Sequence, residues 1–349
     1  VLNKIADIID ENAEYLATVE TMDNGKPIRE TSGADIPLAS DHFRYFAGVI
    51  RADEGSSSMI DENTLNIILR EPLGVVGQIV PWNFPFLMAA WKLAPVLAAG
   101  DVSVFKPSSS TSLSVLELMR LIQNVIPSGV INVITGKGSK SGEYLQHNKG
   151  IDKLAFTGST EVGRQIGLAA AERIIPATLE LGGKSANIFF SDANMDLALE
   201  GIQLGILFNQ GQVCSAGSRI FVQEDFYDEF MGKAIAAFEK VKVGNPLDPN
   251  TQMGAQVSEA QLKKILNYIE IGKQEGAKVA TGGERFIEGD AKNGYFMKPT
   301  LLTDVTNDMR VAREEIFGPV GVVIKFKTEE EVIAMANDSD YGLGGGVFT

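Results

Sequence analysis

Hydrophobic residues along this 349-residue chain recur at two different periods, and the two kinds of segment alternate. Short runs rich in Val, Ile and Phe, typical of buried strands, fall at residues 75–80, 102–105, 130–135, 153–156 and 177–181. Apolar residues spaced three or four apart predict helices between them, at 87–97, 113–126 and 161–172. Because strands that alternate with helices build parallel sheets with both faces covered, the pattern predicts a doubly wound α/β sheet.

The second half of the chain repeats this alternation. Helices are predicted at 197–208, 225–240 and 258–275, and strands at 219–222 and 321–326. Two helices are predicted ahead of the first strand, at about 1–24 and 30–49. A β-prone run with polar residues on both sides, 65–69, follows them and predicts an arm or hairpin. The length, at roughly 150 residues per domain, also favours two domains.

Composition narrows the possible partners and the compartment. The formal charge of −14 argues against nucleic acid or an anionic membrane as a ligand. No run of about 18 apolar residues predicts a membrane helix. A single cysteine cannot form an internal disulfide, which fits a reducing compartment such as the cytoplasm. The two histidines, His42 and His147, lack ligand-like spacing, so no metal site is expected.

Cys214 is the first candidate for chemistry, because small and amide residues surround it. A lone cysteine is most often a small buried hydrophobe, but Gly211, Ser215 and Gly217 offer little packing volume. Upstream, Glu180 ends a predicted strand and runs into a glycine pair that permits close approach of backbone or ligand. A thiol and a carboxylate that meet in one cleft would give covalent catalysis with a general base.

The sequence contains some, but not all, of the features typical of a nucleotide-binding site. The run from Thr157 to Gly163 joins a predicted strand to a predicted helix, where free amides and the helix dipole favour a phosphate. An ordinary capped turn explains the same residues equally well. Lys106 at a strand end could meet a ribose or phosphate, or could simply be solvated. The Gly-x-Gly-x-x-Gly fingerprint is absent, and the run 136–142 lacks phosphate-loop spacing.

Six motifs in order give the chain, over its whole length, a resemblance to the NAD(P)-dependent aldehyde dehydrogenase superfamily. They are Val80-Pro81-Trp82-Asn83-Phe84-Pro85, Phe105-Lys106-Pro107-Ser108, Phe156-Thr157-Gly158-Ser159-Thr160-Glu161-Val162-Gly163, Glu180-Leu181-Gly182-Gly183-Lys184, Gly211-Gln212-Val213-Cys214 and Glu314-Glu315-Ile316-Phe317-Gly318-Pro319-Val320. The resemblance implies two doubly wound domains, a Rossmann-like cofactor domain and a catalytic domain, with a protruding β arm. The expected boundaries are 1–53 with 72–181 for the first, 54–71 for an oligomerisation arm and 182–349 for the second.

The resemblance also implies the chemistry, the oxidation of an aldehyde to a carboxylic acid. Cys214 would attack the carbonyl, and the Asn83 side chain and the Cys214 backbone amide would hold the oxyanion. Glu180 would activate a water to release the acid. The alternatives are a thiol-dependent esterase or acyl transferase, which would need no nicotinamide, and a non-catalytic structural relative.

Cofactor contacts follow from the same resemblance. NAD or NADP would be bound by residues of four motifs, namely Trp82, Lys106, Ser109, Gly158, Ser159, Gly163, Glu315 and Phe317. Many NAD-preferring relatives carry Glu where this chain has Ser109. A carboxylate there would repel a 2′-phosphate and Ser would not, so both cofactors are expected to be tolerated.

Two further expectations concern assembly. Family members form dimers or tetramers, so a homodimer or homotetramer is expected. Both ends of the chain resemble internal cuts. We therefore expect the isolated 349 residues to be poorly active or to aggregate through exposed strand edges.

Overall fold

The computed structural model describes residues 1–349 and divides them into two compact units. The first comprises 1–24 and 31–180, and the second comprises 25–30 and 181–349. The division falls directly after Glu180. The short stretch 25–30, which the predicted boundaries assign to the first domain, belongs to the second unit instead. None of the helices is long and apolar enough to cross a membrane.

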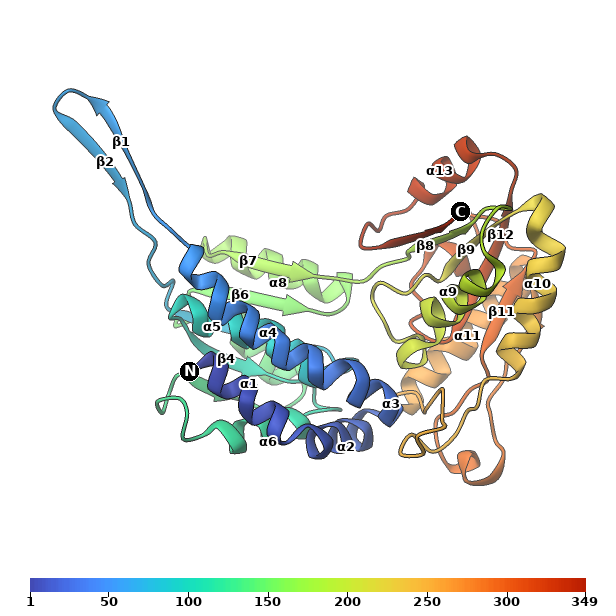
Figure 1. The fold of residues 1–349 in the computed structure, drawn as a ribbon, viewed down its shortest axis with the longest axis horizontal. Helices are drawn as coiled ribbons and strands as arrows, with labels where there is room; N and C mark the ends of the chain where they lie inside the picture. The colour runs from blue at the N-terminus through green and yellow to red at the C-terminus, as the bar shows by residue number, and fades with distance from the viewer. The chain divides into compact units, whose positions relative to one another are not determined.

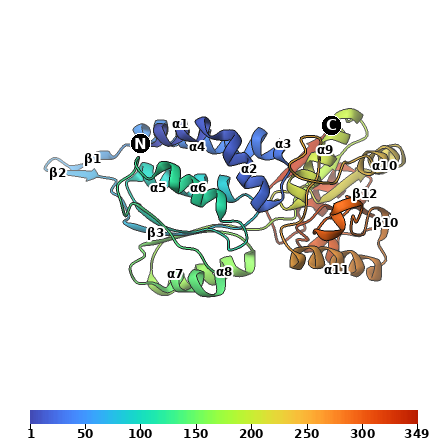
Figure 2. The same cartoon turned by 90° about the horizontal axis from the view of Figure 1, so that it is seen from below.

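The first unit is built on a five-stranded, wholly parallel sheet with the order β5-β4-β3-β6-β7. Its strands are β3 (Val75–Ile79), β4 (Val102–Lys106), β5 (Ile131–Val133), β6 (Lys153–Thr157) and β7 (Ala177–Glu180). Its helices are α1 (Leu2–Glu11), α2 (Ala13–Asn24), α4 (Ile36–Val49), α5 (Pro85–Ala99), α6 (Leu113–Ile122), α7 (Glu143–His147) and α8 (Thr160–Arg173). Figure 2 shows α5 and α6 on one side of this sheet and α7 and α8 on the other, which is the predicted doubly wound arrangement.

Capping residues place several of these helix ends. Pro85 opens α5, and Gly100 ends it in the left-handed conformation (φ 81°). Ser159 caps α8 by accepting a hydrogen bond from the Val162 amide. The helix predicted over 1–24 breaks at Asn12, whose side chain donates to the Ile8 carbonyl at 2.8 Å. The helix predicted over 113–126 ends at Ile122, because Pro127 disfavours helix before it.

An antiparallel hairpin, β1 (Ser56–Asp61) and β2 (Thr64–Ile68), forms a separate two-stranded sheet (Figure 1). The β-prone pattern predicted the second of these strands and missed the first. Every residue of both strands is exposed, including Met59, Ile60 and Leu65. Two strands alone cannot bury an apolar face, so these side chains remain in contact with solvent.

The second unit has a six-stranded sheet with the order β10-β11-β12-β9-β8-β13. Its strands are β8 (Ala186–Phe189), β9 (Arg219–Gln223), β10 (Lys278–Thr281), β11 (Thr300–Thr303), β12 (Val320–Phe326) and β13 (Gly345–Phe348). Its helices are α3 (Ile28–Glu30), α9 (Met195–Leu207), α10 (Glu224–Glu239), α11 (Glu259–Glu275), α12 (Arg310–Arg313) and α13 (Glu329–Asn337). Only β10 runs antiparallel to its neighbour.

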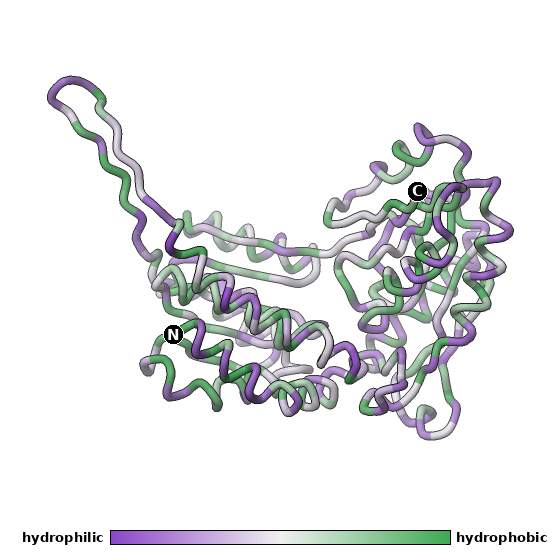
Figure 3. Tube along the Cα trace, viewed as in Figure 1, coloured by the Kyte–Doolittle hydropathy of each residue, from purple (hydrophilic) through white to green (hydrophobic).

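Alternate residues of the central strands build two cores on opposite faces of this sheet. Ile220 and Val222 pack with residues of α9 and α10, whereas Phe221 packs with residues of α11. Neighbouring strand residues point to opposite faces, so one strand serves both cores. Figure 3 shows the corresponding mixture of hydrophobic and hydrophilic positions along the chain.

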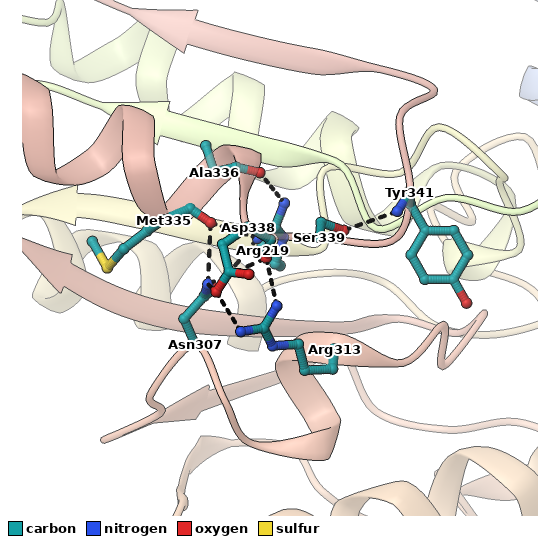
Figure 4. A network of polar contacts seen from close by, with 8 residues as sticks. All are labelled: Arg219, Asn307, Arg313, Met335, Ala336, Asp338, Ser339 and Tyr341. Atoms are coloured by element: carbon teal, nitrogen blue, oxygen red, sulfur yellow. Dashed lines mark hydrogen bonds and ion pairs between the residues drawn. The ribbon is translucent and has the colours of Figure 1, made fainter.

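A buried arginine ties the end of α13 to the sheet (Figure 4). Arg219 is 3% exposed and donates to the Met335 and Ala336 carbonyls at 3.0 and 2.7 Å. It also donates to Asn307 Oδ1 at 3.2 Å and to the Lys184 carbonyl at 2.9 Å. A cation favours the negative end of a helix, and here it also satisfies the last carbonyls of α13.

We predict that Arg219→Met destabilises the second unit by about 3 kcal/mol, because several buried carbonyls lose a charged donor together. The measurement is the urea unfolding midpoint. Arg44→Met is the matched control, since Arg44 is 41% exposed and pairs with Asp7 and Asp10 on the surface. Equal midpoint shifts in the two variants would contradict the importance of the buried network.

Candidate functional site

In the first unit, predicted site residues gather at one edge of the sheet. Asn83 follows β3, Lys106 ends β4, Gly158 follows β6 and Glu180 ends β7. These strands are parallel neighbours, so their carboxyl ends share one edge. The chain order reverses direction between β3 and β6, which is the point where α/β sheets bind ligands.

Lys106 lies almost wholly buried at this edge. Its side chain is 3% exposed, and its ammonium donates to the Pro107 carbonyl at 2.9 Å. Burial lowers the pKa of this amine below that of a free lysine. Gly142 lies beside its aliphatic stem, where a Cβ would make ordinary van der Waals contact at 3.6 Å. Ser109 lies further along the same loop and is exposed.

The turn from β6 into α8 is held by a capping side chain and by the neighbouring strand. Ser159 Oγ accepts from the Val162 amide at 3.4 Å, and the Gly158 amide donates to the Glu180 carbonyl at 3.0 Å. The turn is therefore capped, as one of the two interpretations of this run expected, and Ser159 is the capping residue. Gly163 lies buried within the first turn of α8.

Asn83 is 4% exposed and lies in the loop between β3 and α5, directly after the half-buried Trp82. Lys92, the only charged residue of α5, lies near Glu180 and belongs to none of the six motifs. Burial lowers the pKa of Lys92 to about 8, and the Glu180 carboxylate opposes this shift. A lone charge in an apolar helix is a sequence signal that could have found it.

In the second unit, three of the six motifs lie against one another. A Cβ on Gly183 would overlap the Cys214 carbonyl, and one on Gly211 would overlap the Gly318 carbonyl. A Cβ on Gly182 would come within 2.6 Å of a Glu315 carboxylate oxygen. The glycines therefore permit contacts that any side chain would prevent.

Cys214 lies in a loop after three consecutive residues in the left-handed region. Asn209, Gln210 and Gly211 have φ of 46°, 57° and 72°. Two of these are not glycine, and such backbone costs on the order of 1 kcal/mol or more per residue. Buried side-chain amides fix this turn: Gln210 Nε2 donates to the Ala255 carbonyl at 3.0 Å, and Gln212 Oε1 accepts from the Val257 amide at 3.0 Å. The thiol itself is partly exposed.

Glu315 is the other charged group of this cluster. Its Oε1 accepts from the Gly183 amide at 3.1 Å. Burial raises the pKa of its carboxyl, while that hydrogen bond, Lys264 and Lys184 act in the opposite direction. Phe317 has a left-handed backbone (φ 62°), and its carbonyl accepts from Gln261 Nε2 at 2.6 Å.

Lys184 is a second residue that the sequence analysis did not single out. It is 2% exposed, and its Nζ makes no hydrogen bond in the structure. Burial lowers the pKa of this amine to about 7, and the nearby Glu315 carboxylate only partly opposes the shift. A lysine after a glycine pair is normally expected at the surface, so the sequence carries no signal for this burial.

The predicted residues therefore form two sets. The first unit brings together Asn83, Lys106, Gly158, Ser159 and Glu180, with Trp82, Ser109 and Gly163 on the adjoining loops and helix. The second unit brings together Cys214, Glu315 and Phe317 around the paired glycines. Side chains of His, Cys, Asp and Glu form no group that could hold a metal ion.

We predict that the free energy of unfolding rises with pH from about 7 towards the ordinary lysine range, in part because of Lys184. In that window the unfolded chain binds a proton that the folded chain does not, so raising the pH favours the folded state. In Lys184→Met, the slope of the free energy of unfolding against pH should fall by the equivalent of one bound proton. Urea titrations between pH 7 and 10 measure this slope. The exposed Lys240→Met serves as control, and an unchanged slope in Lys184→Met would contradict the assignment.

Comparisons with known proteins agree with these motifs. The aldehyde dehydrogenase family model matches residues 1–349. Aldehyde dehydrogenase B of Escherichia coli K12 is 58% identical over 356 residues, which cover all of this chain and 69% of that protein. A putative aldehyde dehydrogenase from Burkholderia cenocepacia has a TM-score of 0.98 at 43% identity, covering all of this chain and 71% of that one.

A third relative was solved with a dinucleotide. The NAD+ complex of aldehyde dehydrogenase from Bacillus cereus has a TM-score of 0.97 at 46% identity, over all of this chain and 70% of that one. The chain thus spans about 70% of the length of these relatives. The family match over its full length and the identity to several relatives show that this protein belongs to the aldehyde dehydrogenase family.

Proposed function

We propose that this protein oxidises an aldehyde to a carboxylic acid with Cys214 as the nucleophile. The observation that supports this most directly is the packing of the Cys214 loop against Gly183, beside Glu315, in a chain of this family. A loop held by close backbone packing and buried amides fixes the sulfur for attack.

The protein's own residues would act in four steps. The Cys214 thiolate adds to the aldehyde carbon, and the carbonyl oxygen gains the negative charge of a thiohemiacetal. The Asn83 side-chain amide and the Cys214 backbone amide stabilise that charge. After hydride loss the sulfur carries a thioester, and Glu180 takes a proton from the water that attacks it. Carboxylic acid leaves and the thiolate returns.

A nicotinamide dinucleotide would supply the hydride acceptor for this reaction. The residues at the sheet edge of the first unit fit such a group, because the 14-residue helix α8 begins there beside Gly158 and favours a phosphate. Lys106 would contact the adenosine ribose, Ser159 and Gly163 would border the pyrophosphate, and Trp82 would line the same site. In the second unit, Glu315 and Phe317 would position the nicotinamide ribose and ring. The NAD+ complex of the similar Bacillus cereus enzyme supports this choice of cofactor.

Glu180 would act as the base beside a charged neighbour. Lys92 lies close enough to Glu180 for their charges to interact, and burial lowers the pKa of Lys92.

The remaining proposals concern the roles of the domains, the assembly of subunits and the compartment of the protein. Residues 1–53 with 72–181 would bind the dinucleotide, and 182–349 would hold the nucleophile, with 25–30 packing in the second unit. The segment 54–71 would pair with another subunit in a homodimer or homotetramer, since its apolar side chains are exposed on both strands. One cysteine and a charge of −14 fit the cytoplasm and small-molecule ligands rather than nucleic acid or membrane.

We predict that Cys214→Ala lowers the rate of aldehyde-dependent nicotinamide reduction at least about 1,000-fold, because the chain has no other thiol. Glu180→Gln should retain the rapid first turnover and lose about 100-fold in steady state, because only deacylation needs the base. Stopped-flow absorbance at 340 nm separates the two phases. Glu172→Gln, an exposed residue of α8, is the control.

Three outcomes would oppose the reaction. Full activity in Cys214→Ala would revive a non-catalytic role for the cysteine. Turnover without any nicotinamide would indicate an esterase or acyl transferase instead. Loss of the first turnover in Glu180→Gln would remove this residue from the deacylation step.

We predict that the wild-type enzyme accepts both NAD and NADP and that Ser109→Glu lowers kcat/KM for NADP at least about 10-fold. The new carboxylate would repel the 2′-phosphate and would favour the ribose hydroxyls of NAD. Steady-state kinetics with both cofactors give the comparison. Ser110→Glu adds the same charge one residue away and is the matched control. A wild-type preference for NAD of a thousandfold or more would rule out dual use.

A further inference from the structure

The loop that carries Asn83 joins the end of β3 at Ile79 to the start of α5 at Pro85, and Trp82 to Phe84 lie in neither element. Its last carbonyl, that of Phe84, accepts from the Met88 amide of α5. A buried carbonyl outside the regular strand and helix ladders needs another donor, and a side chain can supply it.

Two buried side chains serve the Trp82 carbonyl. Asn24, the last residue of α2, is 2% exposed and donates through Nδ2 to the Trp82 carbonyl at 2.7 Å. The same nitrogen lies 3.5 Å from the Asn83 carbonyl. Thr111, which is fully buried after β4, donates its hydroxyl to the Trp82 carbonyl at 3.2 Å.

The end of α2 also holds the other side of this loop. Glu20 lies one turn earlier on the helix and is buried, and its carboxylate accepts from the Phe86 amide at 3.2 Å. Phe86 stands in the first turn of α5, so Glu20 satisfies a donor that has no partner within the helix. Contacts from one helix therefore fix the loop on both sides of Asn83.

We propose that Asn24 and Thr111 are positioning residues for Asn83, and this inference rests on the proposed role of Asn83 as an oxyanion donor. The hydrogen bond from Asn24 to the peptide directly preceding Asn83 sets the direction of the Asn83 backbone. The backbone orientation in turn sets the position of the Asn83 side-chain amide. A donor that stabilises a developing charge loses most of its effect when its position shifts by about 1 Å.

The expected effect is selective. Asn24→Leu keeps a similar volume and removes both contacts, so kcat should fall about 10- to 100-fold while KM for aldehyde and cofactor changes less than about 2-fold. Thr111→Val removes the second donor and should lower kcat by a smaller factor. It also provides an independent test should Asn24→Leu fail to fold. Asn12→Leu is the matched control, because its side chain donates only to the Ile8 carbonyl, away from the loop.

A double-mutant cycle tests whether Asn24 acts through Asn83. If it does, Asn24→Leu added to Asn83→Ala should cost less than about 3-fold in kcat. An equal loss of kcat with and without the Asn83 side chain would overturn the proposal and assign Asn24 a purely structural role.

Trp82 gives a readout that is independent of catalysis. The chain has two tryptophans, so Trp91→Phe leaves Trp82 as the sole emitter, and Trp91 is 43% exposed on α5. In that background Asn24→Leu should shift the emission maximum of Trp82 and its quenching by acrylamide. No change in emission together with unchanged kcat would overturn the positioning role. A shifted emission with full activity in both Asn24→Leu and Asn83→Ala would instead refute the oxyanion role, and the inference with it.

Discussion

The second unit depends on three places where a polypeptide backbone or carboxylate lies closer than a Cβ would allow. Gly183 meets the Cys214 carbonyl, Gly211 meets the Gly318 carbonyl and Gly182 meets the Glu315 carboxylate. Each contact joins segments that are distant in sequence. Because a side chain at Gly183 or Gly211 would push two backbone segments apart, the position of the Cys214 loop depends on the absence of side chains there.

Such close packing accompanies an unfavourable backbone. Asn209 and Gln210 adopt left-handed conformations that non-glycine residues rarely take, and Gly211 continues the turn. Buried amide contacts with residues 254–257 offset part of that cost. A turn that is strained and held by several buried hydrogen bonds has few alternative conformations, so the residues that follow it, including Cys214, are held in place.

The helices and strands with a clear hydrophobic period could be predicted from the sequence, whereas several short strands could not. Strands β3, β4, β6, β7, β9 and β12 and helices α5, α8, α10 and α11 were predicted from the pattern to within a few residues. Strands β8, β10 and β11 were not predicted, and β8 follows a polar, glycine-rich run. The motifs indicated the family, and the comparisons confirmed it.

The motifs named the residues of a candidate site, but the sequence did not indicate the buried residues that support them. Asn24 and Lys184 carry ordinary polar side chains in polar or glycine-rich stretches, and nothing in their local sequence indicates that they are buried. Lys92 is an exception, since it interrupts an apolar helix. Burial of a polar group depends on tertiary contacts between distant segments, such as that of Asn24 with Trp82. Such contacts cannot be predicted from the local sequence.

The two units support their functional loops by different physical means, and the difference follows from the loops themselves. The Cys214 loop can approach its neighbours closely, so backbone contact at glycines fixes it. The Asn83 loop contains Trp82 and Phe84 and no glycine. Its Trp82 carbonyl is reached by the side chains of Asn24 and Thr111. A hydrogen bond from a side chain is directional and can be removed by one substitution without changing the volume, whereas a close glycine contact cannot.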